Sequence, residues 1–399
     1  MGLPRGLAIR MKILHLVALA FVSHISRPRG LLLIAAGFLL ASGVSALLLA
    51  VPQGLRNTAT STGRDDVAMI LSAGALDEAS SSIGAKELNL IRALPHVARD
   101  RDGEPMVAPQ FIGMAKFDRP GEGPALVQVR GIDDKTWGVL GATVETLTRE
   151  NAVPGGVWVG QFASSNVPEL ASGNSIRFRG AEWGISGALE AGGALWDSEI
   201  WADLPSVQAA YQSPSRWSTV LVRLERATDL ELLRAELTKD PRLSAVRVIR
   251  QSDYYRLHAG WAADIMLAAA LGVSVLLGLG AAIAVANSLS TSLEGRRREA
   301  ATLRALGFTR GSLVLSTLLE VLIISTAVSC LVILCIAAFF DGRAFSTTSG
   351  GYTIYAELEV VGLSAVFVVT YSAVIGFIAS ALPARRLVRG QIIDGLRAD

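Results

Sequence analysis

Residues 288–310 read SLSTSLEGRRREAATLRALGFTR and separate two long apolar runs, at 265–286 and 312–340. A helix needs about 20 apolar residues to cross a bilayer core, and each run is long enough. An arginine at mid-membrane costs about 2.5–3.5 kcal/mol, so the arginines at 296–298 cannot lie within the lipid. The segment is therefore expected at a membrane face, and the sign of its charge indicates which face.

The composition of the 399-residue chain is intermediate between two classes of protein. It is 51% apolar and 18% charged, which is too apolar for an ordinary soluble protein and too charged for a pure membrane bundle. Residues 52–258 hold mixed charges, prolines and turn glycines, whereas the remainder consists of apolar runs between basic patches. The net charge of +2 gives no reason to expect a nucleic-acid partner.

We therefore predict an α-helical membrane protein with four transmembrane helices and a large α+β extracytoplasmic domain between helices 1 and 2. The predicted segments are a cytoplasmic or interfacial amphipathic helix at 1–30, spans at 31–51, 259–288, 312–340 and 359–382, the extracytoplasmic domain at 52–258, a cytoplasmic loop at 289–311, a short external loop at 341–358 and a cytoplasmic tail at 383–399. A cleaved signal peptide is the competing interpretation of the first apolar run. That run is longer than a signal-peptide core and follows thirty residues of basic lead-in, which favours an uncleaved anchor.

Mixed helical and extended patterns indicate the α+β class for residues 52–258, with one or two lobes. The opening residues, 52–64, are polar and have the composition of a flexible segment. Strands are predicted at 66–71, 125–132, 156–160, 175–179, 182–189, 218–224 and 247–249, and helices at 85–94, 203–211 and 229–238. A domain of this size can bury its own core.

The orientation follows from the distribution of basic residues in the short loops. Residues 1–30 hold five lysines and arginines and no acid, and residues 289–311 hold five arginines. The tail holds four arginines, whereas residues 341–358 hold one arginine beside two acids. Four spans with both termini in the cytoplasm satisfy these counts, and they place 52–258 outside the cytoplasm of an inner (plasma) membrane.

Motifs for the common catalytic and metal-binding chemistries do not occur in the sequence. It contains no G-x-x-x-x-G-K-[ST], no G-x-S-x-G and no H-E-x-x-H. The four histidines lack metal-ligand spacing, and Cys330 and Cys335 lie in one apolar run where they face different directions. We expect no catalytic residue, no cofactor and no metal. Asp253 and Asp264 flank the entry to the second span. Asp264 lies only a few residues into that span, so an acid in contact with interfacial water is favoured over a buried proton relay.

The layout of one span, a large domain and three further spans resembles the FtsX/MacB-like permease family, the membrane halves of type VII (mechanotransmission) ABC systems. Residues 298–308, REAATLRALGF, are close to the family's R-E-I-x-x-L-R-A-L-G-F segment, with Ala300 in place of the usual isoleucine. Leu318–Glu320 and the ending at 382–386 extend the likeness. In the central domain, the segments that resemble one export-permease branch of the family lie at 129–132, 182–183, 192–193, 197–203, 240–243 and 253–255.

The resemblance implies a dimer of permeases with a separate ABC ATPase (nucleotide-binding) subunit docked on the cytoplasmic side of each. The second permease would be another copy or a paralogue, and ATP would be used only by the partner ATPase. A periplasmic adaptor or outer partner and membrane lipids complete the expected contacts. The expected function is export or extraction of a substrate by ATPase-driven motion of the external domain, without catalysis by this chain. Two alternatives are an FtsX-like regulator of an extracellular hydrolase and an ATP-independent membrane receptor.

The ATPase-coupling site is predicted on the helix that the central segment forms, which good helix formers favour and a glycine ends. Leu303 and Leu306 share a face with Glu299, and charged residues lie at its margins. By its residues alone this helix could equally anchor to lipid headgroups, and the resemblance favours docking to the ATPase. The predicted coupling residues are Arg298, Glu299, Leu303, Arg304, Leu306, Gly307 and Phe308.

Overall fold

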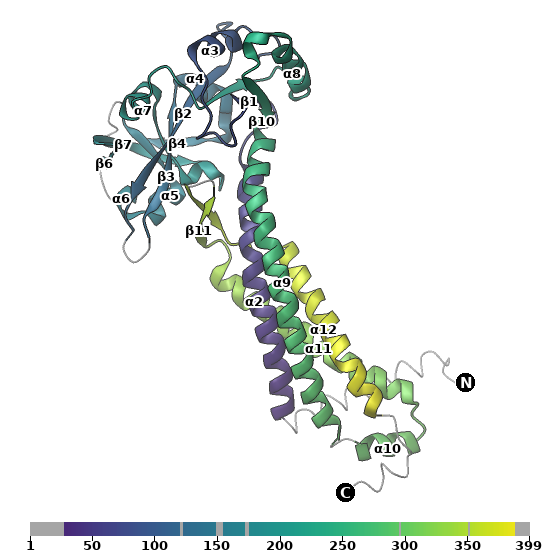
Figure 1. Cartoon of the computed structure of the whole chain (residues 1–399). Helices are drawn as coiled ribbons and strands as arrows, with labels where there is room; N and C mark the ends of the chain where they lie inside the picture. Colours follow the sequence, from purple (N-terminus) through teal and green to yellow (C-terminus); the bar gives the residue numbers. More distant parts are fainter. Residues whose placement is uncertain are drawn as a thin grey trace. The chain divides into compact units, whose positions relative to one another are not determined.

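The computed structural model describes residues 28–119, 123–148, 155–171, 175–294, 297–349 and 352–387. Most of the predicted amphipathic segment at 1–30 and residues 388–399 of the tail lie outside these ranges. The described chain forms two compact units (Figure 1). The helical unit comprises residues up to Val51, Met266–Gly342 and the chain from Glu359, and the α+β unit comprises Pro52–Ile265 and Arg343–Leu358.

Four helices of the described chain are long and apolar enough to cross a membrane, as predicted. They are α2 (Pro28–Ser61), α9 (Gln251–Glu294), α11 (Arg310–Phe340) and α12 (Leu363–Leu387). They pack side by side (Figure 1) around a core to which each contributes, for example Phe38, Val285, Ile324 and Ile375. Leucines, isoleucines and phenylalanines on the opposite faces are exposed, as expected of side chains that meet lipid tails.

Small residues on α9 allow close contact with α12. Ser274 is buried, and its carbonyl accepts a hydrogen bond from the Tyr371 hydroxyl. A Cβ atom at Gly278 would overlap the same Tyr371 hydroxyl, whereas Gly272 and Gly280 have open space in front of their Cα atoms. Ser274 and Gly278 lie one turn apart and face α12, whereas Gly272 and Gly280 do not.

Gly278 and Gly280 provide a matched test of the packing between α9 and α12. We expect Gly278→Ala to lower the thermal unfolding midpoint of the detergent-solubilised chain, because overpacking a close contact costs about 1–3 kcal/mol. Gly280→Ala adds the same methyl group to the same helix in open space, so its midpoint should equal or exceed that of the wild type. Equal midpoints for the two variants would contradict the contact between α9 and α12.

Helix α2 extends ten residues beyond Val51, into a stretch whose polar composition predicts a flexible segment. Within this stretch Leu55 and Ala59 are fully buried in the α+β unit. Thr62, just after the helix, accepts a hydrogen bond at 2.8 Å from the backbone N–H of Leu195. Tertiary packing therefore keeps helical a segment that composition alone does not favour, and the prediction of a flexible segment there is wrong.

The α+β unit is built on a ten-stranded sheet with the order β10-β1-β9-β2-β3-β8-β5-β7-β4, in which β6 also pairs with β7. The strands are β1 (Val67–Ser72), β2 (Val107–Phe117), β3 (Ala125–Ile132), β4 (Glu145–Thr148), β5 (Val157–Gly160), β6 (Ser175–Phe178), β7 (Ala181–Glu190), β8 (Ile200–Asp203), β9 (Thr219–Arg223) and β10 (Val246–Arg250). Most pairs are antiparallel, but β3 runs parallel to β8 and β5 parallel to β7. The mixed sheet confirms the predicted α+β class.

Two hydrophobic cores divide the sheet into two lobes. The first lies under α3 (Ala85–Arg92) and α8 (Leu230–Lys239), whose Ile91 and Leu233 pack against β1, β9 and β10. The second lies between β3, β5, β7 and β8 and the helices α5 (Gln161–Asn166) and α7 (Leu204–Ala210). The remaining helical elements are α4 (Asp134–Leu140), α6 (Pro168–Ala171), α10 (Arg297–Ala305), η1 (Gly141–Thr143), η2 (Leu195–Ser198), η3 (Ala227–Asp229) and η4 (Pro241–Leu243).

The segment between α11 and α12, predicted as a short loop, forms a β-hairpin that belongs to the α+β unit. Its strands are β11 (Ala344–Ser349) and β12 (Tyr352–Glu357), and Tyr355 is 1% exposed in the second core. The backbone N–H of Tyr355 donates to the Ser198 hydroxyl at 3.0 Å. Gly54 of α2 lies so close to the Glu357 carbonyl that a Cβ atom there would overlap it. The hairpin is thus an integral part of the α+β unit.

Candidate functional site

The predicted coupling segment forms α10 and the turn that leads into α11. The N–H of Phe308 donates to the Leu303 carbonyl and the N–H of Gly307 to the Arg304 carbonyl, both at 3.1 Å. Gly307 has a φ of +94°, the left-handed conformation that glycine adopts without strain. This pair of bonds is a Schellman motif, which ends the helix as the sequence predicts. Thr309 then caps α11 by accepting the Ser312 N–H at 3.2 Å.

One face of α10 is fixed against the start of α11. Leu303 and Phe308 pack with buried Ala300 and Leu313. The contact between Leu303 and Phe308 is the hydrophobic contact that usually accompanies a Schellman motif. Ala300, the departure from the usual isoleucine, is buried in this cluster. The apolar face predicted for α10 is therefore partly used within the chain.

The outer surface of α10 combines charge with one exposed apolar side chain. Arg298 and Glu299 are exposed, Arg304 is half-buried, and Leu306 is 73% exposed. Leu306 follows the end of the helix and does not join the cluster around Ala300. Of the predicted residues, Leu303, Gly307 and Phe308 shape the turn, and Arg298, Glu299 and Leu306 offer a surface.

A buried ionic cluster in the α+β unit was not predicted from the sequence. Arg130 of β3 is 1% exposed and donates to Glu199 at 2.7 Å and to Glu78 at 2.9 Å. Gln110 accepts from the same guanidinium at 2.8 Å, and Gln128 donates to Glu199 at 2.7 Å. Nothing in the alternation of β3 distinguishes Arg130 from a solvent-facing residue, so no sequence signal could have identified it.

The cluster contains two carboxylates and one guanidinium. Burial by itself would lower the pKa of Arg130, but Glu199 and Glu78 raise it well above its ordinary value. Burial raises the pKa of Glu199, an effect that the charge of Arg130 opposes. Trp201 donates to Glu199 at 2.8 Å, so an indole also stabilises this carboxylate. The Arg130 guanidinium therefore remains charged. Its ion pairs hold together the segments that contain Glu78 and Glu199, which are distant in the sequence.

Removing Arg130 should destabilise the α+β unit. Arg130→Met leaves two buried carboxylates without their counter-ion, so we expect the free energy of unfolding to fall by about 3–5 kcal/mol. Urea unfolding of the detergent-solubilised chain, followed by near-UV circular dichroism of the buried tryptophans, measures the change. Glu78→Gln and Glu199→Gln added to this variant should restore part of the loss. Arg242→Met removes an arginine from an exposed ion pair and serves as the control. If Arg130→Met lowers the free energy of unfolding no more than Arg242→Met does, the stabilising role of Arg130 is contradicted.

The structure also brings together three residues that could bind a metal ion. Ligand atoms of His96, Glu225 and Asp229 all lie within 4.8 Å of one another, although these residues show no metal-ligand spacing in the sequence. Asp229 already accepts the backbone N–H of Arg226 at 3.1 Å, and the Arg226 guanidinium lies 3.5 Å from the same carboxylate. The Arg226 guanidinium would compete with a metal ion for the Asp229 carboxylate. The expectation that the chain holds no metal stays a prediction.

The two acids near the second predicted span form exposed ion pairs. Asp264 is 65% exposed and pairs with Arg56 of α2. Asp253 pairs with Arg256 one turn along α9. Both acids are therefore paired with arginines, and their contact with interfacial water stays a prediction.

Comparisons with known proteins give a family match for part of the chain. Residues 271–392 match the family model described as FtsX-like permease C-terminal. No curated protein matches the chain.

Two solved structures resemble the chain at 13% identity. One is the extracellular domain of the noncanonic ABC-type transporter YknZ from Gram-positive bacteria, with a TM-score of 0.34 over 46% of this chain and 100% of that chain. The other is the periplasmic region of MacB from Actinobacillus actinomycetemcomitans, with a TM-score of 0.35 over 49% of this chain and 93% of that chain.

The family match begins within α9 and includes α10, α11 and α12, so it contains the segment at 298–308 on which the resemblance was based. Residues 271–392 of this chain are therefore similar to the C-terminal domain of FtsX-like permeases.

Proposed function

We propose that this chain couples ATP hydrolysis on a separate cytoplasmic ATPase to motion of the α+β unit, for export or extraction of a substrate. The observation that carries the proposal is the outer surface of α10, where Arg298, Glu299 and Leu306 project from a turn that is fixed by hydrogen bonds and packing. The family match supports an ATPase partner. The sequence contains no phosphate-binding P-loop motif, so ATP is used by the partner.

A partner docked on the outer surface of α10 can transmit motion only if α10 is rigidly attached to the neighbouring helix. A docked partner that pulls on α10 moves α11 as well, because Leu303 and Phe308 pack with Leu313 and the intervening turn is hydrogen-bonded. Helix α9 is unbroken from Gln251 to Glu294 and contributes residues to both units. A continuous helix carries an axial or rotational displacement over its length, and α9 is the helix that we propose for this role.

The grouping of the loops supports the predicted topology. Residues 343–358 and 52–265 belong to one unit, so both connections lie on the same side of a membrane that the four helices cross. With four alternating spans, the proposal puts α10 and both termini on the opposite side. The basic residues of the α10 loop make that side the cytoplasm in our proposal.

Substitutions on α10 test the coupling directly. We expect Glu299→Lys to abolish the permease-dependent component of ATPase activity in the purified complex, because it reverses a charge at the docking surface. Membrane insertion should be unchanged, since Glu299 is exposed. Glu169→Lys reverses an exposed acid of α6 and is the matched control. Normal coupling in Glu299→Lys would refute docking through this surface.

Leu306→Asp provides an independent variant, because it replaces an exposed apolar contact with a charge. Loss of a well-packed interface leucine costs on the order of 1–2 kcal/mol, so ATPase binding should weaken about five-fold to thirty-fold. Leu232 of α8 is also exposed, and Leu232→Asp should leave binding unchanged. The ATPase itself is identified first, by pull-down from native membranes. If no ATPase co-purifies, the receptor alternative is favoured, and co-purification of an external hydrolase would favour the regulator.

Cysteine labelling tests the orientation. In a background of Cys330→Ala and Cys335→Ala, a membrane-impermeant maleimide should label Asp102→Cys in intact spheroplasts. Ala305→Cys on α10 should react only after permeabilisation. Both positions are exposed in the folded chain, so differences in labelling report the side of the membrane. The reverse pattern would overturn the proposed topology.

A further inference from the structure

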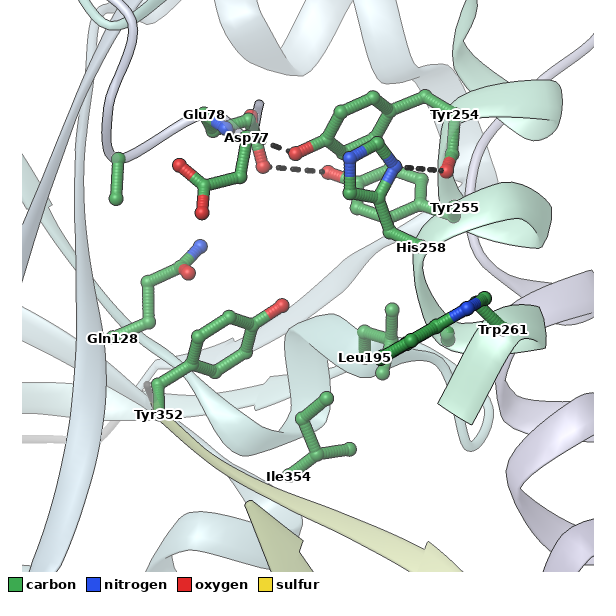
Figure 2. Close-up of a pocket in the computed structure, with 12 residues that line it drawn as sticks. Asp77, Glu78, Gln128, Leu195, Tyr254, Tyr255, His258, Trp261, Tyr352 and Ile354 are labelled. Atoms are coloured by element: carbon green, nitrogen blue, oxygen red, sulfur yellow. Dashed lines mark hydrogen bonds between the residues drawn. The ribbon is translucent and has the colours of Figure 1, made fainter. Parts of the chain in front are cut away.

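The α+β unit encloses a cavity of about 180 Å³ that lies next to the Arg130 cluster. Five segments that are distant in the sequence line it (Figure 2): the loop after β1, β3, η2, the first turns of α9 and β12. The side chains that line it include Asp77, Glu78, Tyr254, His258, Trp261 and Tyr352. Trp261 is 68% exposed and marks the mouth, whereas Tyr254 is buried.

One end of the cavity is acidic. In Figure 2 the Asp77 carboxylate, the Gln128 amide and the Tyr352 hydroxyl point into the same open space. Asp77 accepts the Ser80 N–H at 2.8 Å, a bond that fixes the carboxylate without neutralising it. Glu78 lies beside Asp77 and shares Arg130 with Glu199. None of the described residues lining the cavity is a lysine or an arginine.

His258 does not remove this excess of negative charge. Its Nδ1 lies 2.9 Å from the Tyr254 carbonyl and its Nε2 lies 2.6 Å from the Leu76 carbonyl. Both nitrogens are therefore occupied, and the ring stacks on Tyr254 with 4.1 Å between centroids. Even if His258 carries a proton on each nitrogen, Asp77, Glu78 and Glu199 supply three carboxylates against two cations. A net negative charge remains at this end.

The other walls are aromatic and aliphatic. The rings of Tyr254, Tyr352 and Trp261 border the space together with Leu195 and Ile354. Burial raises the pKa of the Tyr352 hydroxyl, and the nearby carboxylates add to that effect, so Tyr352 is a neutral hydrogen-bonding group. Aromatic faces attract cations, most strongly where water is excluded. An acidic end with aromatic walls is complementary to a cation that carries a small apolar group.

We propose that this cavity binds an organic ammonium ion, with the ammonium group at Asp77 and its apolar part between Tyr254, Tyr352 and Trp261. The ammonium could belong to a free small amine or to the amino terminus of a peptide, which present the same chemistry to the site. The site uses no residue of α10, so it is independent of ATPase docking. Its occupant contacts α9, β12 and the loop after β1 at once, and therefore bridges these elements within the α+β unit.

Matched probes test the charge requirement. Isothermal titration of the full-length chain in an uncharged detergent, with empty micelles as the blank, measures binding of 2-phenylethylammonium. We expect 2-phenylethanol and phenylacetate, its neutral and anionic analogues, to bind at least ten-fold more weakly. The dipeptide amide Ala-Phe-NH2, compared with its N-acetylated form, distinguishes a peptide terminus from a free amine. Equal binding of charged and neutral partners in both series would overturn the proposal.

Variants locate the site. Asp77→Asn keeps an oxygen for the Ser80 N–H and removes only the charge, so 2-phenylethylammonium should bind about ten-fold to a hundred-fold more weakly. Asp102→Asn neutralises an exposed aspartate of another loop and should leave affinity unchanged. Tyr352→Leu removes an aromatic wall and should weaken binding several-fold, which provides a second test if Asp77→Asn does not fold. Wild-type affinity in a folded Asp77→Asn variant would refute the assignment.

Discussion

The α+β unit depends on one buried guanidinium. Arg130 joins Glu78, which follows the first strand, to Glu199, which precedes β8, and the Tyr255 hydroxyl of α9 lies 3.5 Å from it. Both lobes of the sheet and the start of a long helix therefore meet at a single charge. Such an arrangement is a poor source of net stability, because desolvation offsets much of the attraction. Its effect is to fix relative positions, since any displacement leaves a buried charge without its partner.

The same cluster defines the ligand cavity. Glu78 is a member of the cluster and also lines the cavity, and Tyr255 contributes to both through its ring and hydroxyl. The excess carboxylate that makes the cavity attractive to cations is thus held in place by the contacts that organise the fold. An occupant that neutralises this charge would be coupled energetically to the positions of the two lobes and α9.

Much of this architecture could be predicted because its signals are local. Four long apolar runs, a Gly307 that ends a short helix, and alternating strands such as β6 and β7 are evident from composition and spacing. Other elements were missed for identifiable reasons. Strand β2 contains Pro109 and Gly113 and is buried on both faces, so it shows no clean alternation. The helical continuation of α2 depends on the burial of Leu55, which only the folded unit supplies. The Arg130 cluster and the cavity arise from segments far apart in the chain, and no spacing rule connects them.

The β11–β12 hairpin has a consequence for biosynthesis. Tyr355 completes a core whose other members lie between Phe111 and Tyr211, and it is the last part of that core to leave the ribosome. After residue 211 has emerged, about 140 further residues, including two long apolar helices, must be synthesised before this side chain is available. The core of the α+β unit is therefore complete only after α11 has been synthesised. Completion of this core consequently waits for synthesis of two apolar helices, and a nascent chain without the hairpin lacks the contacts of Tyr355 with Ser198.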